Sequence, residues 1–407
     1  MKKGLRLRNL VAGALTVSFL LAAGGGIPSS PVQAASEKAT FKDTIPAWAK
    51  SSVETAVQAG ILSGYPDGTF KPNNPITRAE LLKVMALTFD LKVNTATSGA
   101  WYLPYKQALM DAKIYMANDY TGDINKSVTR NEMAKLAIRG AKAEYRGKFM
   151  TAAELMFRAV NAGLLGRTGT NADTIDTAGT TTRAQAAVLI TRLLQLQNGG
   201  TLPVDKGASS AAEIAWHRHN MITMFNQNDL VPLPYTKNID STYDVVIEQL
   251  IILDPGDSTG YYSEYTNQVN NWELSGKKVS ANDGYLFAYK LKGVSKVADS
   301  TKAKYIRSSF YMLNEGPSAG FYIPRKYVYD NSLTDKKGLY QNNATFRLNK
   351  VGASGYDFYY SFVDKDFIQS QIQTYGALPI HLEKYAKQMD KTTQFYLTEV
   401  KDRQWIK

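Results

Sequence analysis

The sequence predicts a multidomain protein in which an all-α half precedes an α+β half rich in antiparallel sheet. A Thr-Arg-x-Glu/Gln motif occurs three times within the first 200 residues, at intervals of 52 and 53 residues. Nineteen of the 25 tyrosines follow residue 200, a bias typical of strands with amphipathic surfaces. Strand-length apolar runs separated by Asp, Gly, Asn, Ser and Pro also fill this second half. The 407 residues suffice for two or three domains with separate cores.

The amino terminus has the features of a secretory signal peptide over residues 1–34. Four basic residues, the last of them Arg8, precede an apolar run over residues 10–23, and the segment ends in Val-Gln-Ala34. The alternative is a membrane-anchoring helix, although the run is shorter than the roughly 20 residues that a span needs. We expect an exported protein without a nucleic-acid partner and, after cleavage, without a membrane partner.

Charge and cysteine content narrow the function classes further. The chain carries 48 Lys and Arg against 36 Asp and Glu, a formal net charge of +12, and it has no cysteine. Disulfides and thiolate chemistry are therefore excluded, and we expect neither a cofactor nor a metal site. Residues 35–200 hold 20 basic and 14 acidic residues, whereas residues 201–407 hold 24 and 22. The first half is thus predicted to have an anionic partner.

Each repeat is predicted to form two helices around a loop. In the first copy, helical apolar spacing ends at Gly60, which suits the left-handed residue that terminates a helix. A turn-rich loop follows over residues 64–70. The second helices should begin at Thr77, Thr129 and Thr182, each with a capping box completed three residues later by Glu80, Glu132 and Gln185 respectively.

An arginine follows each of these caps: Arg78, Arg130 and Arg183. A cation at this place opposes the positive end of the helix dipole, so capping alone does not account for it. A guanidinium beside free backbone N–H groups would make a strong site for a carboxylate or phosphate. We therefore expect exposed arginines that bind an anion; the alternative is ordinary surface placement.

The three units resemble S-layer homology (SLH) domains. The first copy carries Phe41-Lys-Asp43, Trp48-Ala49, Gly64-Tyr-Pro-Asp-Gly68-Thr-Phe70 and Ile76-Thr-Arg-Ala-Glu80. The resemblance implies tandem SLH repeats at residues 36–92, 99–144 and 147–197 in a pseudo-threefold helical assembly. It also implies binding to an anionic secondary cell wall polysaccharide, often one with ketal-linked pyruvate, on the surface of a Gram-positive-type bacterium. The pyruvate carboxylate matches the anion site inferred from the arginines.

Around the arginines, the resemblance adds Asp43 and Trp48 as binding-site residues. For Trp48 a core position is favoured over a sugar-stacking platform, while a helix-start role and a ligand role both stay open for Asp43. Glu80, Glu132 and Gln185 are expected to cap first and to contact ligand second. The second copy lacks a Trp-Ala pair and has Lys113 where the helix-ending glycine should be. We expect unequal sites, the best of them involving Arg78 or Arg183.

The second half is predicted to comprise a flexible linker over residues 198–210 and an α+β domain over residues 211–407. Its first helix should span residues 211–225. Predicted strands cover residues 243–253, 284–291, 305–313, 344–348, 356–363 and 394–400, with short helices at 367–375 and 380–389.

This domain shows no recognisable catalytic motif, so no catalytic residue is assigned. His217 and His219 look like part of a metal site, but residues two apart do not share a helix face, which favours a surface or interface role. The pairs Asp254 with Asp257 and Asp364 with Asp366 could serve glycoside hydrolysis, yet they lie beside turn formers or a helix start. Tyrosine clusters at 261, 262 and 265 and at 356, 359 and 360 could bind sugar or protein, with sheet packing favoured.

Two functional classes remain. The favoured one is a non-catalytic cell-surface protein, anchored non-covalently by its repeats, whose second domain binds or assembles with itself or with other surface proteins. The alternative is an anchored hydrolase of polysaccharide or peptidoglycan with an unrecognised catalytic site. The absence of a recognisable catalytic constellation favours the first class, whereas a deep cleft with two carboxylates about 5–10 Å apart would favour the hydrolase.

Overall fold

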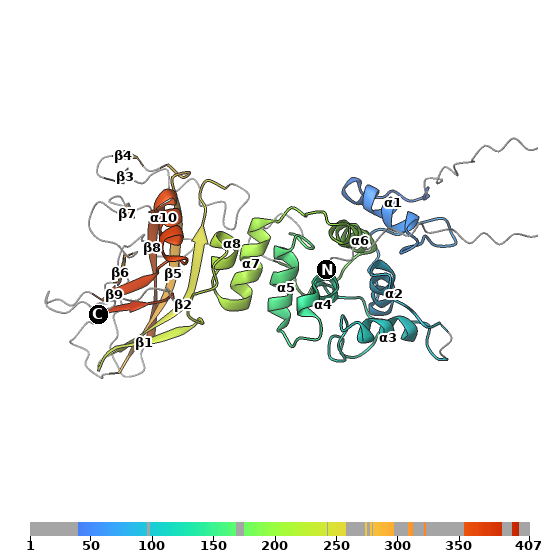
Figure 1. Cartoon of the computed structure of the whole chain (residues 1–407), viewed down its shortest axis with the longest axis horizontal. Coiled ribbons are helices and arrows are strands. Elements are labelled where there is room, and N and C mark those ends of the chain that lie inside the picture. Colours follow the sequence, from blue (N-terminus) through green and yellow to red (C-terminus); the bar gives the residue numbers. More distant parts are fainter. Residues whose placement is uncertain are drawn as a thin grey trace, which may run out of the picture. The chain divides into compact units, whose positions relative to one another are not determined.

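The computed structural model describes residues 40–95, 98–167, 175–241, 243–257, 273–274, 277–278, 280–296, 308–311, 321–322, 354–384 and 393–398. The predicted signal peptide, the predicted strand at residues 344–348 and the tyrosines at 261, 262 and 265 lie outside these ranges. Figure 1 shows helices in the first part of the chain and a sheet in the second.

Six helices form three helix-loop-helix units in the first half. They are α1 (Lys50–Gln58) and α2 (Arg78–Thr88), α3 (Leu103–Asp111) and α4 (Arg130–Ala141), α5 (Ala152–Asn161) and α6 (Arg183–Gln197). Short 3-10 turns, η1 (Ala47–Ala49) and η2 (Ala143–Tyr145), precede α1 and follow α4. The second helix of every unit starts directly after the predicted Thr cap, and each has a complete capping box. The predicted helix starts are therefore confirmed.

The first helix of each unit ends with a residue in the left-handed region. Gly60 has φ +68° and Gly163 has φ +74°, whereas Lys113 adopts φ +57° at the same place in the second unit. Glycine enters this region at no steric cost, but a residue with a Cβ atom is strained there. Lys113 therefore replaces the expected glycine while keeping its backbone conformation.

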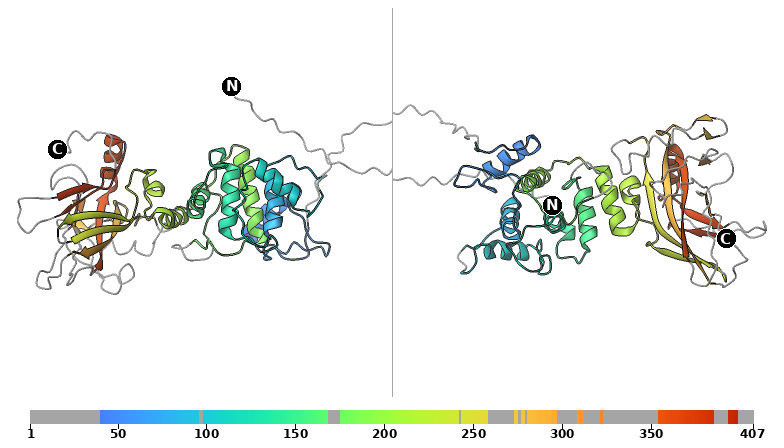
Figure 2. Two further views of the ribbon diagram at one scale, coloured as in Figure 1. Left: turned by 90° about the horizontal axis from the view of Figure 1, so that it is seen from below. Right: turned by 180° about the vertical axis from the view of Figure 1, so that it is seen from behind.

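The six helices pack in a cyclic order. Helix α3 packs on α2, α5 packs on α4, and α1 packs on α6, so each first helix lies on the second helix of another unit. The helices α2, α4 and α6 also contact one another. Further views of the ribbon show the same neighbours (Figure 2). One apolar core, which includes Leu82, Leu136 and Leu189, runs through all three units.

Backbone hydrogen bonds close the three units into a ring. The amide of Ile76 donates to the carbonyl of Thr181, Thr181 donates to Val128, and Val128 donates to Ile76, each over 2.9 Å. All three residues lie just before a second helix. The bond between Ile76 and Thr181 directly joins residues more than a hundred positions apart in the sequence.

Helix α7 (Lys206–His217) occupies part of the predicted flexible linker. Asp205 caps it by accepting from the amide of Ala208 at 3.0 Å, and residues 207–212 are buried. Ala208 and Ala212 belong to the core of the helical half, and α7 packs on α5. The linker prediction is wrong from residue 206 onward, because the small residues that suggested flexibility instead allow close helix packing.

The predicted helix at residues 211–225 is broken in the structure. After α7 the chain turns at Arg218, which has φ +68°, and resumes as α8 (Met221–Phe225). The side chain of Asn220 accepts from the amide of Ile252 at 2.7 Å and donates to its carbonyl at 2.8 Å. These two bonds to a neighbouring strand stabilise the break, which helical periodicity alone does not reveal.

A five-stranded antiparallel sheet forms the centre of the second half. Its order is β1 (Tyr235–Asp240), β2 (Tyr243–Leu253), β5 (Gly284–Ser295), β8 (Ser354–Asp364) and β7 (Phe321–Tyr322). In the β2–β5 pair, Ile252 lies opposite Phe287, and both belong to a second core that also includes Met221 and Phe225 of α8. Helix α10 (Lys365–Tyr375) follows β8 and confirms the predicted helix there.

The remaining described strands form two small sheets. One has the order β10 (Thr393–Tyr396), β9 (His381–Lys384), β6 (Ser308–Tyr311), and the other pairs β3 (Glu273–Leu274) with β4 (Lys277–Lys278). The predicted helix at residues 380–389 is wrong at residues 381–384, because β9 pairs with strands on both sides. The prediction of an α+β half with antiparallel sheet is confirmed.

Candidate functional site: the arginines between units

The three predicted anion-binding arginines lie inside the helical assembly. Arg78, Arg130 and Arg183 are 8%, 5% and 6% exposed. The prediction that they would be exposed is therefore wrong. Each guanidinium crosses from the start of one second helix to the loop of another unit, where it donates to backbone carbonyls. Their shared position reflects contacts between units, which a single repeat does not reveal.

The helix N-termini beside these arginines are also occupied. The amides of Arg78 and Ala79 donate to the carbonyls of Lys126 and Ile124, at 2.9 and 3.1 Å. The equivalent amides of the other two helices donate to residues 179 and 177 and to residues 74 and 72. The free N–H groups on which the predicted anion site relied are thus absent from the starts of α2, α4 and α6.

Arg78 joins the first unit to the second through an ion pair. Its Nη1 donates to the carbonyls of Thr121 and Asp123 at 2.8 and 2.9 Å, and its Nη2 lies 2.6 Å from Glu132 Oε1. The side chain also passes 5.5 Å from the ring centre of Tyr120. Glu132 therefore neutralises Arg78 within the protein.

Arg183 joins the third unit to the first with neutral partners. Its Nε donates to the carbonyl of Phe70 at 2.9 Å and its Nη2 donates to that of Ser63 at 2.6 Å. The guanidinium lies 4.8 Å from the ring centre of Tyr65 and 4.6 Å from that of Phe70. Among the described residues, no carboxylate lies within ion-pair distance of Arg183. Within the described part of the chain, carbonyl dipoles and aromatic faces are what balance its charge.

Arg130 lies between the second and third units. Its Nη2 donates to the carbonyl of Gly166 at 2.7 Å. Burial lowers the pKa of Arg130, while the nearby charge of Asp176 raises it and that of Arg192 lowers it further. Among the described residues the three interfaces thus differ: Arg78 has an ion pair, Arg183 has two aromatic neighbours and no carboxylate partner, and Arg130 donates to one carbonyl.

Asp43 fixes the loop that supplies an acceptor to Arg183. Its two oxygens accept from the amides of Phe70 and Lys71 at 2.8 and 2.7 Å. Burial raises the pKa of Asp43, but these backbone hydrogen bonds outweigh it and the net pKa is lowered. The helix-start role is wrong, because Pro46 occupies the position before η1.

Trp48 is 60% exposed, so the favoured core position is wrong. Trp101 occupies the same place in the second unit, since each tryptophan lies two residues before its helix and twelve before the left-handed residue. Phe149, three residues before α5, is 85% exposed. Each unit therefore carries an exposed aromatic where its first helix begins. The equal spacing in the first two units was the sequence signal for this feature.

The predicted capping residues perform that role. Glu80, Glu132 and Gln185 accept from the amides of their caps Thr77, Thr129 and Thr182 at 2.8, 3.0 and 3.0 Å. Glu132 alone among them also binds an arginine. One carboxylate of Glu132 thus both caps a helix and pairs with an arginine of another unit. Substitution of Glu132 should therefore disturb more contacts than substitution of Glu80.

A cavity of about 210 Å³ lies between the loop of the second unit and the start of α5. Its lining includes Lys135, Phe149 and the buried pair Asp119 with Arg139, whose oxygen and nitrogen are 2.6 Å apart. The cavity therefore combines an exposed aromatic ring with both signs of charge.

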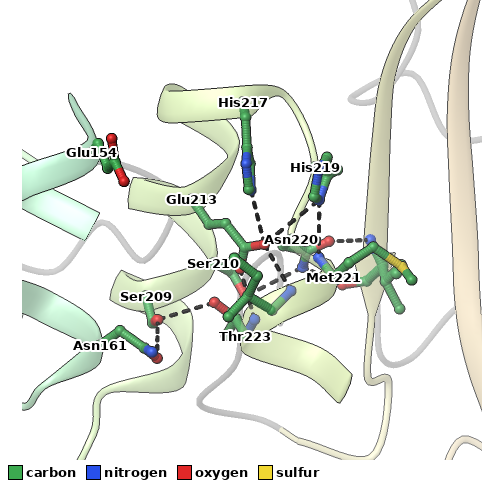
Figure 3. Close-up of polar contacts among 12 residues, drawn as sticks. Glu154, Asn161, Ser209, Ser210, Glu213, His217, His219, Asn220, Met221 and Thr223 are labelled. Atoms are coloured by element: carbon green, nitrogen blue, oxygen red, sulfur yellow. Dashed lines mark hydrogen bonds and ion pairs between the residues drawn. The ribbon is translucent and has the colours of Figure 1, made fainter. Parts of the chain in front are cut away.

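His217 and His219 lie side by side, contrary to the expectation for residues two apart on one helix. The left-handed turn at Arg218 stacks their rings 3.7 Å apart, above the fully buried Glu213 (Figure 3). Burial raises the pKa of Glu213, but hydrogen bonds lower it by more, the largest contribution coming from His217. Burial lowers the pKa of His219.

The paired aspartates of the second half have structural contacts. Asp254 forms an ion pair with Lys365 at 2.9 Å, and Asp364 caps α10 by accepting from Phe367 at 2.9 Å. Asp366 lies in the first turn of α10. These contacts match the turn and helix-start roles that the sequence suggested as ordinary alternatives to catalysis.

Comparison with known proteins supports the identification of the first unit. Residues 40–82 match the model of the S-layer homology domain. The chain is 31% identical over 149 residues to an uncharacterized cell wall amidase of Bacillus anthracis, covering 34% of this chain and 26% of that protein. It is 27% identical over 204 residues to the S-layer protein of Bacillus thuringiensis subsp. finitimus, covering 46% and 24%. It is 26% identical over 181 residues to exoglucanase XynX of Acetivibrio thermocellus, covering 39% and 16%.

The chain spans about a quarter of the length of the first two of these relatives. The domain match and the S-layer relatives support a bacterial cell-surface or cell-wall protein that carries an SLH domain. Within the described ranges, no helix has the length and apolar character needed to cross a membrane.

Proposed function

We propose that the helical half is a set of three SLH repeats about a pseudo-threefold axis. On this proposal it anchors the protein non-covalently to an anionic, carboxylate-bearing secondary cell wall polysaccharide. The cyclic packing of the helices and the closed ring of hydrogen bonds support three equivalent units. The family match supports the assignment of the first unit, and the recurring capping boxes extend it to the other two.

The interface between the third and first units is the best candidate for the anion. Arg183 carries the proposal, because it has no carboxylate partner among the described residues, whereas Glu132 neutralises Arg78. A wall carboxylate would supply the missing counter-charge, and a charge-assisted contact of this kind contributes about 1.5–3 kcal/mol. The turn η1, which holds the exposed Trp48, packs on α6, which begins with Arg183. Trp48 would then offer its face to a neighbouring sugar ring.

Wall pelleting tests this proposal by changing first the polysaccharide and then the protein. Mild acid removes ketal-linked pyruvate from purified walls, and we expect the protein to stay in the supernatant with walls treated in this way. Arg183→Gln should weaken pelleting by about tenfold or more, because a loss of 1.4 kcal/mol already corresponds to tenfold. Arg183→Lys, which keeps the charge, is the matched variant and should retain more binding.

Because Arg183 is buried, thermal unfolding of both variants must accompany the assay. Undiminished pelleting by a folded Arg183→Gln variant would contradict the assignment of the site. Undiminished pelleting on acid-treated walls would contradict the pyruvylated ligand while leaving the wall anchor itself intact.

For the second half we propose a binding or assembly role. Two relatives are named as an amidase and an exoglucanase, so display of a hydrolase is the second candidate. Against it, the paired aspartates in the described part of this half serve an ion pair and a helix cap. Release of soluble sugar or peptide from purified walls by the whole chain would favour the hydrolase.

A further inference from the structure

The turn between α7 and α8 brings together three side chains that commonly bind metals. His217 Nε2 lies 3.0 Å from Glu213 Oε1, and His219 Nδ1 lies 3.5 Å from the same oxygen (Figure 3). All three donor atoms lie within 4.8 Å of one another. Neighbouring ligands of a tetrahedral zinc ion lie about 3.4 Å apart, given bond lengths of about 2.0–2.1 Å. The cluster is therefore close to the size of a coordination site.

The surrounding backbone holds Glu213 in place. The amide of Ile222 donates to Oε1 at 2.8 Å, and that of Thr223 donates to Oε2 at 2.7 Å. The histidine side of the turn is fixed to strand β2, because the amide of Leu250 donates to the carbonyl of Arg218 at 3.0 Å. Hydrogen bonds that orient the ligands are a regular part of metal sites, since they position the donor atoms in advance.

His219 offers a ring nitrogen that can coordinate a cation. The amide of Met221 donates to His219 Nδ1 at 3.3 Å, so this nitrogen presents a lone pair. The same nitrogen faces the Glu213 oxygen at 3.5 Å. A cation bound here would replace the Met221 amide as the partner of this nitrogen. Its positive charge would also offset the negative charge of the buried Glu213 carboxylate.

At least one of the two imidazoles must turn before both can bind one ion. Their planes are only 19° apart, so the in-plane lone pairs run nearly parallel. The side chain of His217 is 18% exposed and can rotate, whereas that of His219 is 4% exposed. Rotation of His217 would also change its stacking on Trp216, whose ring centre is 4.0 Å away. The exposed edge of His217 leaves room for water as a further ligand.

We propose that Glu213, His217 and His219 bind one divalent transition-metal ion of the zinc type. Two imidazoles and one carboxylate suit zinc, while magnesium and calcium prefer sites made of oxygen ligands. The ion would stabilise the turn between α7 and α8. This turn links the two cores, since α7 contributes to the core of the helical half and α8 to that of the sheet half.

Titration of the metal-free whole chain with Zn²⁺ in a calorimeter tests the site. We expect one ion per chain, no comparable binding of Mg²⁺, and a rise in Tm when Zn²⁺ is present. His217→Ala should weaken binding by more than the roughly 10–100-fold that changes to outer contacts cost. The chain has three histidines, so His381→Ala is the matched control and should bind as the unchanged protein does.

Nuclear magnetic resonance of the whole chain with ¹⁵N-labelled histidine tests the site without substitution of any metal-binding residue. Zn²⁺ should shift the imidazole signals of two histidines and leave the third, assigned with His381→Ala, in place. Absence of 1:1 binding, full binding by His217→Ala, or unmoved imidazole signals would each overturn the proposal.

Discussion

Lys113 carries a backbone strain that its counterparts in the other units avoid. Its φ of +57° lies where the equivalent Gly60 and Gly163 have +68° and +74°. A left-handed conformation costs a residue with a Cβ atom about 1–2 kcal/mol, and the greater freedom of glycine in the unfolded chain offsets part of any gain. We expect Lys113→Gly to raise the free energy of unfolding by about 0.5–1 kcal/mol, measured by urea denaturation.

Gly60→Ala is the reciprocal variant. No atom lies within 4 Å of the position that a Cβ would take at Gly60, so the substitution adds backbone strain without a clash. It should lower the free energy of unfolding by about 1 kcal/mol. If Gly60→Ala destabilises while Lys113→Gly changes nothing, packing of the Lys113 side chain in the space beside Gly147 offsets the strain.

Residue roles that depend on neighbours in the sequence were predictable, and those that depend on another unit were not. The capping boxes follow from a four-residue pattern, and all three are present. The burial of Arg183 depends on carbonyls of Ser63 and Phe70, which precede it by 120 and 113 residues. No local pattern contains that information, so the arginines were expected in solvent.

At the scale of elements, the starts of α2 and α4 offer a matched comparison. Glu80 and Glu132 cap their helices in the same way, but only Glu132 also binds Arg78. Glutamine can complete the capping box, as Gln185 does in α6. Glu132→Gln should therefore lower the free energy of unfolding by about 2 kcal/mol, because the buried Arg78 loses its counter-charge.

Glu80→Gln should cost only about 0.5 kcal/mol, which is the size of the favourable interaction between a carboxylate and a helix N-terminus. Thermal or urea unfolding of the two variants measures the difference. Equal losses of unfolding free energy in the two variants would mean that the Arg78–Glu132 ion pair adds no stability beyond that of the helix cap.

Elements were predictable where one periodicity dominates the segment. Strand β2 has the bounds that its apolar run predicted, and β8 and α10 are each displaced from their predicted ranges by no more than two residues at either end. The sequence predicts a helix across strand β9, because the pairing of β9 with β10 and β6 is non-local and leaves no mark in the local pattern. The break between α7 and α8 depends similarly on bonds from Asn220 to β2.

At the scale of the whole molecule, the helical half extends to α7. Ala208 and Ala212 belong to its core, Trp216 packs against it, and Ser209 bonds to Asn161 of α5 at 3.0 Å. A fragment of residues 36–197 should therefore be less stable than one of residues 36–218. The expected difference in unfolding free energy is about 2 kcal/mol or more, the contribution of one large buried side chain.

Thermal unfolding of the two fragments measures this contribution of α7. Equal Tm values would show that α7 adds nothing to the helical half. A domain boundary at residue 210, where the sequence composition changes, would cut through this helix.

The ring of bonds through Ile76, Val128 and Thr181 also dictates an order of assembly. Helix α1 packs on α6, which is the last helix of the three units to be synthesised. When only the first two units have been synthesised, α1 lacks this partner and the ring stays open. Closure joins segments more than a hundred residues apart. The chain loses loop-closure entropy in this step before the new contacts stabilise it. The ring of three units can thus close only after α6 has been synthesised.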